Sequence, residues 1–351
     1  MNTAGGTEDG TPRAGPGAGR ALLRVEPADF RVDERIDMAA EPAGEHLWLR
    51  VRKTGENTDY VARLLAKAAG VDGRAIGFAG RKDRHAVTTQ WFSIQLPGKP
   101  DPDFSSLPPS VEVLESLRRQ RKLQTGALRG NDFVLRLRDF EGDAGLLERR
   151  LEDVRRDGVP NYFGVQRFGR EAGNLGRARA WFAGALRVCD RSERGILISS
   201  ARSAIFNAVL ARRVAEGNWA QLLPGEAIQL DGSGSFFHDD GSDDTLAARL
   251  SAGDIHPSGP LWGTGDPSSR DAARALELAV VTGLQDLADG LVVNGLRQER
   301  RPLRLVPSGL TWAWPGKNVC EVSFGLPAGC YATTLLAELL DTREPGRETP
   351  A

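Results

Sequence analysis

Alternation of apolar and polar side chains along the chain predicts β-strands. In residues 90–96, Phe92, Ile94 and Leu96 occupy every second position, and residues two apart share one face of a strand. Comparable patterns predict strands over residues 22–34, 46–53, 75–79, 133–138, 310–314 and 318–324. These segments lie in the first and last parts of the chain, so we expect a sheet that draws strands from both.

Apolar positions three and four residues apart predict helices between these strands. The clearest helix is capped by Asn57 or Thr58 and ends at Gly70, since such polar residues favour helix starts and glycine favours helix ends. Its apolar stripe consists of Tyr60, Val61, Leu64, Leu65 and Ala68. Further helices are expected over residues 146–157, 200–216 and 333–341.

The sequence pattern changes beyond Pro160, which indicates an insertion. Residues 162–169 are aromatic and glycine-rich, and the strand pattern returns only near Val306. We therefore expect one mixed α/β domain that is interrupted by a second one. The predicted parts are a disordered Gly/Pro-rich tail at 1–19, a discontinuous domain at 20–157 and 307–341, an insertion at 158–306 and a flexible tail at 342–351.

Composition argues against several classes of protein. No run of about 18 apolar residues is present, so no membrane span is expected, and the N-terminus lacks the pattern of a secretory signal. The three cysteines form no CxxC pair and the four histidines no HExxH motif. We therefore do not expect a disulfide scaffold, a metal enzyme or a secreted protein. The expected location is a reducing cytoplasm. Phosphate-loop, dinucleotide-binding and GxSxG motifs are also absent.

Charge is unevenly distributed along a chain whose formal net charge is −1. Residues 116–131 contain five basic side chains and no acid, whereas residues 231–254 contain six aspartates and one arginine. A local basic track can bind phosphates even on a nearly neutral protein. A solvated charged face explains the basic run at 118–122 equally well, and both interpretations stay open.

One loop concentrates candidate chemistry. Asp83 lies among Arg81, Lys82, Arg84 and His85, after a predicted strand and close to Gly80. Neighbouring cations within ~4–6 Å favour the ionised form of an aspartate, which is the nucleophilic one. The same cations can hold phosphate groups. Spacing alone does not distinguish this from a solvated turn with local salt bridges.

Five motifs resemble those of the TruD family of tRNA pseudouridine synthases. The stretch AGRKDRHAVTTQWFSI, residues 79–94, is similar to the catalytic loop and the strand that follows it in that family. The other matches, in family order, are PADF at 27–30, GNDF at 130–133, VPNYFGVQRFG at 159–169 and LPAGCYAT at 326–333. Together they span almost all of the expected ordered chain.

The resemblance implies roles for individual residues. Asp83 would be the catalytic nucleophile, and Phe30, Asn131 and Tyr331 would contact the target nucleotide. Tyr331 stands where relatives commonly have phenylalanine, which keeps the ring but adds a hydroxyl that needs a partner if buried. Supporting or RNA-contacting roles fall to Arg24, which would pair with the aspartate, and to Lys82, Arg84, Phe133 and Arg167. We expect Phe133 itself to pack in the core.

The implied fold is α+β: a pseudouridine synthase domain with a central mixed or antiparallel sheet, and an inserted α/β domain of the TruD type. The implied activity is isomerisation of uridine to pseudouridine in tRNA, at position 13 of the D arm, without metal or cofactor. The expected partner is tRNA, bound by a cytoplasmic monomer. Two alternatives remain: a catalytically idle protein that binds and folds tRNA, and a nucleoside hydrolase or glycosidase that uses an aspartate.

Overall fold

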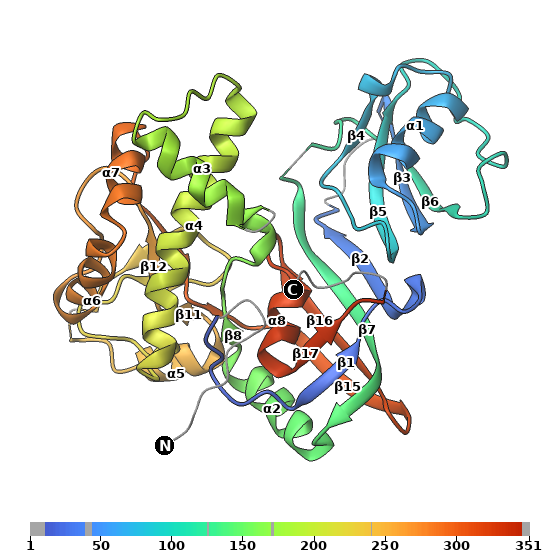
Figure 1. Ribbon diagram of the computed structural model, residues 1–351. Coiled ribbons are helices and arrows are strands. Elements are labelled where there is room, and N and C mark those ends of the chain that lie inside the picture. The colour runs from blue at the N-terminus through green and yellow to red at the C-terminus, as the bar shows by residue number, and fades with distance from the viewer. Residues whose placement is uncertain (1–10, 39–43, 125, 170–171, 240, 346–351) are drawn as a thin grey trace. The chain divides into compact units, whose positions relative to one another are not determined.

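A computed structural model of the chain describes residues 11–38, 44–124, 126–169, 172–239 and 241–345. The described residues fall into two compact units, each of which combines distant segments of the chain (Figure 1). The first, here called the sheet unit, comprises the described residues within Arg20–Gly142, Pro307–Cys330 and Thr342–Ala351. The second, the helical unit, comprises the described residues within Met1–Gly19, Asp143–Val306 and Tyr331–Asp341.

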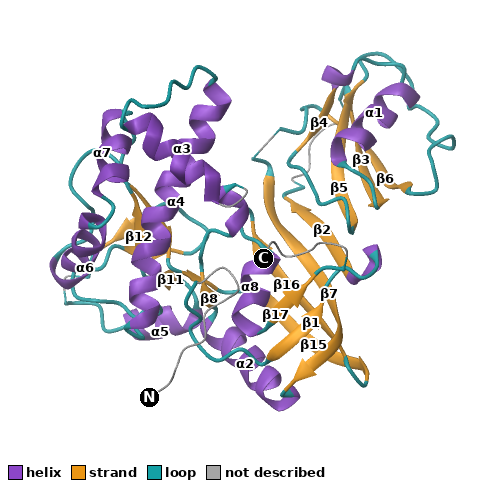
Figure 2. Cartoon of the chain, in the orientation of Figure 1, coloured by secondary structure: helices purple, strands orange, loops and turns teal. Residues whose placement is uncertain are grey.

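The sheet unit is built on a ten-stranded mixed sheet (Figure 2). Its main path runs through β15 (Ser308–Gly316), β16 (Val319–Pro327), β7 (Leu128–Gly142), β2 (Phe30–Ile36), β5 (Val87–Gln95), β3 (His46–Thr54) and β6 (Val111–Arg119). Off this path, β4 (Ile76–Phe78) pairs with β5, and β1 (Gly19–Leu22) pairs with β7 and β17 (Asp341–Arg343). Strands from both ends of the chain thus share one sheet, as the apolar patterns predicted.

The centre of this sheet contains a parallel pair. β2 runs parallel to β5, with Val32 opposite Thr88, whereas β2 and β7 are antiparallel, as are β5 and β3. Parallel neighbours begin at the same edge of a sheet. The segment that precedes β2 and the loop that precedes β5 are therefore brought to one edge.

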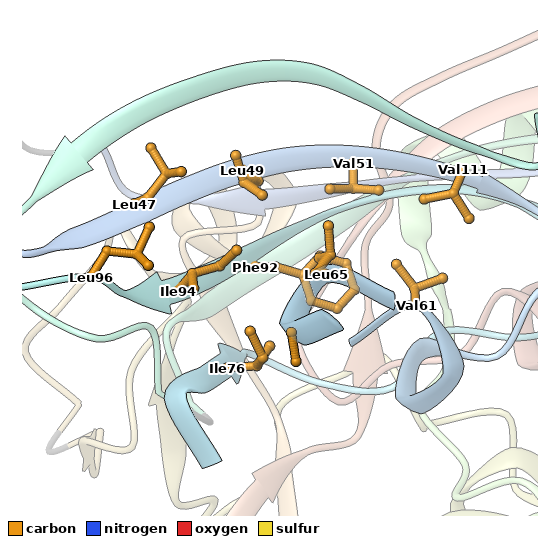
Figure 3. Close-up of a cluster of buried hydrophobic side chains, with 11 residues drawn as sticks. Leu47, Leu49, Val51, Val61, Leu65, Ile76, Phe92, Ile94, Leu96 and Val111 are labelled. Atoms are coloured by element: carbon orange, nitrogen blue, oxygen red, sulfur yellow. The ribbon is translucent and has the colours of Figure 1, made fainter. Parts of the chain in front are cut away.

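Helix α1 (Thr58–Ala68) packs on the sheet over an apolar core (Figure 3). Apolar side chains of β3 and β5 alternate toward this core, as predicted, and Val61 and Leu65 of the helix complete it. Tyr60, at the edge of the predicted stripe, is 36% exposed. Asn57 is the N-cap residue, but its side chain makes no capping hydrogen bond. Asn57 therefore occupies the predicted N-cap position, but its side chain does not form the expected capping hydrogen bond.

The other face of β5 is buried as well. Trp91 packs with Trp48, Ala79 and Leu123 in a second cluster, and the hydroxyl of Ser93 accepts a hydrogen bond of 2.9 Å from the Leu123 main chain. A strand that is covered on both faces is shielded from water along its length. The strand that follows the candidate catalytic loop is thus among the most enclosed parts of the sheet unit.

The basic run at 118–122 begins in a strand that the sequence analysis did not predict. β6 pairs antiparallel with β3, with Arg118 opposite Leu47. Arg118 donates 2.7 Å bonds to Asp101 and to the carbonyl of Lys99, and the Arg119 guanidinium lies 5.1 Å from the Trp48 ring centroid. These two guanidinium groups have partners within the sheet unit. This favours a charged structural face over an RNA-binding track for this part of the basic run.

The helical unit is organised around the long helix α4 (Arg191–Ala215). The helix begins earlier than the predicted residue 200, because the Asp190 side chain caps it by accepting a 2.7 Å bond from the Glu193 main chain. Three helices that the sequence analysis did not predict pack against α4, namely α3 (Gly173–Phe182), α6 (Asp271–Thr282) and α7 (Gln285–Val293). The shared core includes Leu197, Ile205, Val281 and Leu287.

Three small sheets and a further helix also belong to this unit. One sheet consists of β9 (Ile228–Leu230), β10 (Phe236–Phe237) and β11 (Ile255–His256), next to α5 (Leu246–Ala252); another pairs β12 (Ser258–Leu261) with β13 (Glu299–Pro302). β8 (Val159–Pro160) pairs with β14 (Arg304–Leu305). This last pairing brings the two ends of the predicted insertion, 158–306, side by side.

Helices α2 (Ala144–Asp157) and α8 (Ala332–Leu339) also belong to the helical unit, although the predicted domain division placed them with the strands. A buried ion pair of 2.8 Å joins Arg150 of α2 to Glu338 of α8. Part of the predicted N-terminal tail packs here too: Arg13 is buried and pairs with Asp341 at 2.5 Å. Residues 1–10 and 346–351 of the two predicted tails lie outside the described residues.

Glu338 yields a testable prediction on pH and stability. Its Oε1 accepts bonds from Arg150 and from the main chain of Ala14 at 2.7 Å and Gly15 at 3.2 Å, yet burial dominates and raises the pKa of Glu338 to about 7. A carboxyl whose folded pKa exceeds its unfolded value contributes stability at low pH that is lost as the pH rises from 4.5 to 7. The wild type should therefore lose up to ~3 kcal/mol over this range relative to Glu338→Gln.

Urea unfolding of both proteins at pH 5 and pH 8 measures this difference, because the other titrating groups cancel between them. An unfolding free-energy difference that is equal at the two pH values would contradict the raised pKa of Glu338.

Candidate active site

The parallel pairing of β2 and β5 brings the candidate residues of the sheet unit together. Asp83 lies in the loop between β4 and β5, and Arg24 and Phe30 lie just before and at the start of β2. Since both strands begin at the same edge, side chains that are 59 positions apart in the sequence come into contact there.

Asp83 presents an exposed carboxylate held by one arginine. Its side chain is 61% exposed, and Oδ2 accepts a hydrogen bond of 2.5 Å from Nη2 of Arg24, whose own side chain is only 10% exposed. Arg24 has a φ of +59°, a conformation that residues other than glycine seldom adopt and that often occurs at functional sites. The pairing of Arg24 with the aspartate, implied by the family resemblance, is present in the structure.

Arg24 has two more partners in the sheet unit. Its guanidinium carbon lies 3.9 Å from the centroid of the Phe30 ring, within the range of a cation–π contact. Its Nη1 donates to the carboxylate of Glu344. Glu344 falls in the predicted flexible tail and was missed by the sequence analysis. It is brought here because the Leu23 main chain bonds to the Arg343 carbonyl at 2.8 Å, a pairing that no local pattern indicates.

The main chain of the loop is braced by buried polar side chains. Gln90 donates to the Gly80 carbonyl at 3.2 Å. The Thr58 hydroxyl donates to Gln90 at 2.9 Å and accepts from the Lys82 main chain at 3.0 Å. Lys53 donates to the Asp83 carbonyl at 2.9 Å. The glutamine of the TTQW stretch thus has a structural role, because together with Thr58 and Lys53 it fixes the loop that presents Asp83.

Lys82 is directed inward. Its ammonium forms a 2.8 Å ion pair with Glu34, and the two side chains are 8% and 0% exposed. The second oxygen of Glu34 accepts a 2.9 Å bond from the Trp91 main chain. The pair therefore ties the loop to β2 and β5. Lys82 was expected to support the site or to contact RNA; in this structure its charged group faces Glu34, which is a supporting position.

Phe30 and Phe133 lie in the aromatic core of the sheet unit. Phe30 is 3% exposed; Phe133 meets it edge-on at 6.2 Å and stacks on Phe324 at 5.5 Å. Phe133 is thus a core residue, as alternation along its strand indicated. One face of the Phe30 ring is covered by Arg24, so stacking of a base on that face requires the guanidinium to move.

Asn131 holds a buried amide on β7, opposite Glu34 of β2. It is 8% exposed, and its Oδ1 has no hydrogen-bond partner among the residues that the structure describes. A buried acceptor left unpaired costs ~1–3 kcal/mol. Such an oxygen is suited to receive a hydrogen bond from a ligand, for example from the N3–H of uracil.

The remaining predicted residues are placed as follows. Arg84 is exposed and donates to the Gly55 carbonyl at 3.3 Å. Arg167, in the short helix Val165–Phe168 of the helical unit, donates to Ser199 at 2.8 Å and lies 5.1 Å from the Phe163 ring. Tyr331 precedes α8 in the same unit and is 39% exposed. The sheet unit alone therefore assembles Asp83, Arg24 and Phe30.

Within the described ranges, no group of three or more His, Cys, Asp or Glu side chains could hold a metal ion. None of the helices in these ranges is both long and apolar enough to cross a bilayer.

Known proteins resemble this chain along nearly its whole length. The family model described as tRNA pseudouridine synthase D (TruD) matches residues 14–178 and 172–339. The tRNA pseudouridine synthase D of Nitrosococcus oceani is 47% identical over 332 residues, covering 94% of this chain and 93% of the relative. That of Pseudomonas syringae pv. tomato is 48% identical, with 94% of each chain covered.

A solved structure shows the same fold. The putative tRNA pseudouridine synthase D of Methanosarcina mazei superposes with a TM-score of 0.73 at 21% identity, covering 93% of this chain and 95% of that one. The α+β fold that the motifs implied is thereby confirmed. The matched family model, the identity to the curated relatives and this fold agree, and the chain belongs to the TruD family of tRNA pseudouridine synthases.

Proposed function

We propose that this protein is an isomerase that converts uridine to pseudouridine in tRNA, with Asp83 as its nucleophile. The observation that carries the proposal is the presentation of Asp83: an exposed carboxylate on a loop whose main chain is fixed by buried side chains, paired with Arg24 at 2.5 Å. A solvated turn needs no such bracing. Several relatives named tRNA pseudouridine synthase D, which are 45–48% identical to the chain, support the assignment.

The reaction requires the target uridine to leave its base stack, which costs a few kcal/mol. Asp83 attacks C1′ of the ribose or C6 of the pyrimidine, and the bond between N1 and C1′ breaks. The uracil turns and its C5 forms a bond with C1′. The bond to Asp83 breaks, which returns the carboxylate, the C5 proton passes to a base, and N1 takes up a proton. The product is an isomer of the substrate, so atoms and electrons balance without an oxidant, a reductant or water.

The neighbouring residues have distinct roles in this proposal. Arg24 holds the Asp83 carboxylate by a charge-assisted hydrogen bond. The unpaired Oδ1 of Asn131 receives a hydrogen bond from the uracil edge, and the Phe30 and Tyr331 rings stack on the base, a contact worth ~1–3 kcal/mol per base. Movement of Arg24 off Phe30 would open the stacking face. Arg84 and Arg167 bind phosphates.

We propose position 13 of the D arm as the target, and a monomer in the cytoplasm as the form that acts on it. The three cysteines are free thiols, which suits a reducing compartment. An idle tRNA-binding protein of the same fold is the second candidate. It would explain the basic side chains, but not the braced and exposed carboxylate.

The test is incubation of the purified protein with an unmodified tRNA transcript that carries U13, followed by mapping of pseudouridines at nucleotide resolution. A matched transcript with C13 serves as the control. We expect one pseudouridine, at position 13, and none in the control. Pseudouridine elsewhere would refute the target position alone. A tRNA that is bound and unchanged would support the idle protein, and release of free uracil would support a hydrolase.

A further inference from the structure

Lys53 is a fully buried cation that contacts the candidate catalytic loop. It lies near the end of β3 and is 0% exposed, and it is among the largest side chains that are completely buried. Its ammonium donates hydrogen bonds to two main-chain carbonyls, that of Glu56 at 2.7 Å and that of Asp83 at 2.9 Å. Lysine is almost never fully buried without a specific partner, so these two contacts need an explanation.

The charges around Asp83 show what Lys53 adds. Lys82 is paired with Glu34, and Arg24 is shared between Asp83 and Glu344. Lys53 is a further cation close to Asp83, and its hydrogen bonds go to main-chain carbonyl oxygens. Burial lowers the pKa of Lys53 to about 8; attraction to Asp83 and Glu56 opposes this shift, and repulsion by Lys82 adds to it. Lys53 is thus charged at neutral pH and loses its charge in the mildly alkaline range.

We propose that Lys53 is a positioning residue for the reaction at Asp83: its ammonium holds the Asp83 main chain in place and supplies a buried positive charge beside the carboxylate. A bond from a charged donor is stronger than one between neutral groups. With its carbonyl held, the Asp83 main chain has less freedom to move. A nucleophile displaced by about 1 Å can lose ~10²-fold in rate.

Burial separates this role from RNA binding. Since Lys53 has no exposed surface, its replacement should change the chemical step and leave the affinity for tRNA intact. A residue that acts on Asp83 through its main chain therefore affects kcat. A phosphate-binding lysine would instead affect the Kd for tRNA.

The inference rests on the proposed function and is tested with Lys53→Met and Lys53→Gln, which are neutral at every pH. Lys67→Met, an exposed lysine on α1 of the same unit, is the matched control. We expect kcat for pseudouridine formation to fall ~10²-fold in both Lys53 variants, with a Kd for tRNA within about twofold of the wild type. The control should keep the wild-type kcat.

The pH profile adds a readout that a merely structural role would not change. In the wild type, kcat should decline as the pH rises through about 8, because Lys53 loses its charge there; in the Lys53 variants this decline should be absent. Wild-type kcat in either Lys53 variant, or a wild-type profile without the decline, would overturn the role of Lys53. If Lys53→Met does not fold, the glutamine variant and the wild-type profile decide.

The two proposals fail differently. A wild-type protein that forms no pseudouridine in any tRNA would refute the proposed function and the role of Lys53 with it. An active wild type with equally active Lys53 variants would refute only the role of Lys53.

Discussion

Replacement of Asp83 with asparagine is expected to lower kcat for pseudouridine formation by ~10⁴–10⁶-fold, the scale of loss when a catalytic nucleophile or its charged partner is removed from an enzyme. The amide has nearly the same shape, and its oxygen can still accept the bond from Arg24, so the loop should keep its conformation. An amide oxygen carries no negative charge with which to attack the substrate. The affinity for tRNA should remain close to that of the wild type.

Single-turnover kinetics measures the rate of the chemical step, and filter binding measures the affinity for tRNA. Asp72→Asn is a matched control, because the Asp72 side chain is 67% exposed, near the 61% of Asp83, and its partner is the neighbouring Arg74. The control should retain wild-type kcat. Pseudouridine formation by the Asp83 variant at the wild-type rate would exclude this carboxylate as the nucleophile.

Replacement of Lys82 with methionine is expected to destabilise the protein by ~3–5 kcal/mol, the cost of leaving one member of a buried ion pair without its partner. Glu34 is 0% exposed, so its carboxylate would remain in the interior, where the Trp91 main chain is its remaining donor among the described residues. The same change frees the loop from β2, and kcat should fall as well. Urea unfolding measures the loss of stability.

The adjacent residue supplies the control for Lys82. Arg81 pairs with Asp59 at 2.9 Å on the surface, where the two side chains are 76% and 47% exposed. Arg81→Met should therefore cost less than ~1 kcal/mol. Adding Glu34→Gln to Lys82→Met should recover much of the lost stability, since the buried charge is removed while an acceptor for Trp91 remains. An equal loss of unfolding free energy in the Arg81 and Lys82 variants would show that the buried Lys82–Glu34 pair stabilises the protein no more than the exposed Arg81–Asp59 pair does.

The Lys82 result bears on how a charged motif is interpreted. In the sequence, Arg81, Lys82 and Arg84 form one basic group around Asp83. In the structure they differ: Arg81 and Arg84 are exposed, whereas the Lys82 ammonium is buried against Glu34. Adjacent residues in a loop point in different directions, so charge along a sequence does not report which cations face a ligand.

The local features of this protein follow from its amino-acid sequence. Alternation in residues 90–96 placed Phe92 and Ile94 on one face of β5, and periodicity placed Val61 and Leu65 on the inner side of α1; the structure confirms both. Phe133 was correctly placed in the core. The motifs around Asp83 identified the family, because residue types at fixed spacing are properties of the chain alone.

Contacts between residues that are distant in the sequence depend on how the strands pair. The parallel pairing of β2 with β5 places Arg24 and Phe30 beside Asp83, and the pairing of β1 with β17 brings Glu344 to Arg24. Lys53, which no sequence pattern singles out, becomes the buried donor to the Asp83 carbonyl. Periodicity tells which face of a strand a side chain occupies, but strand order and register depend on long-range contacts, and these set the partners of every charge at the site.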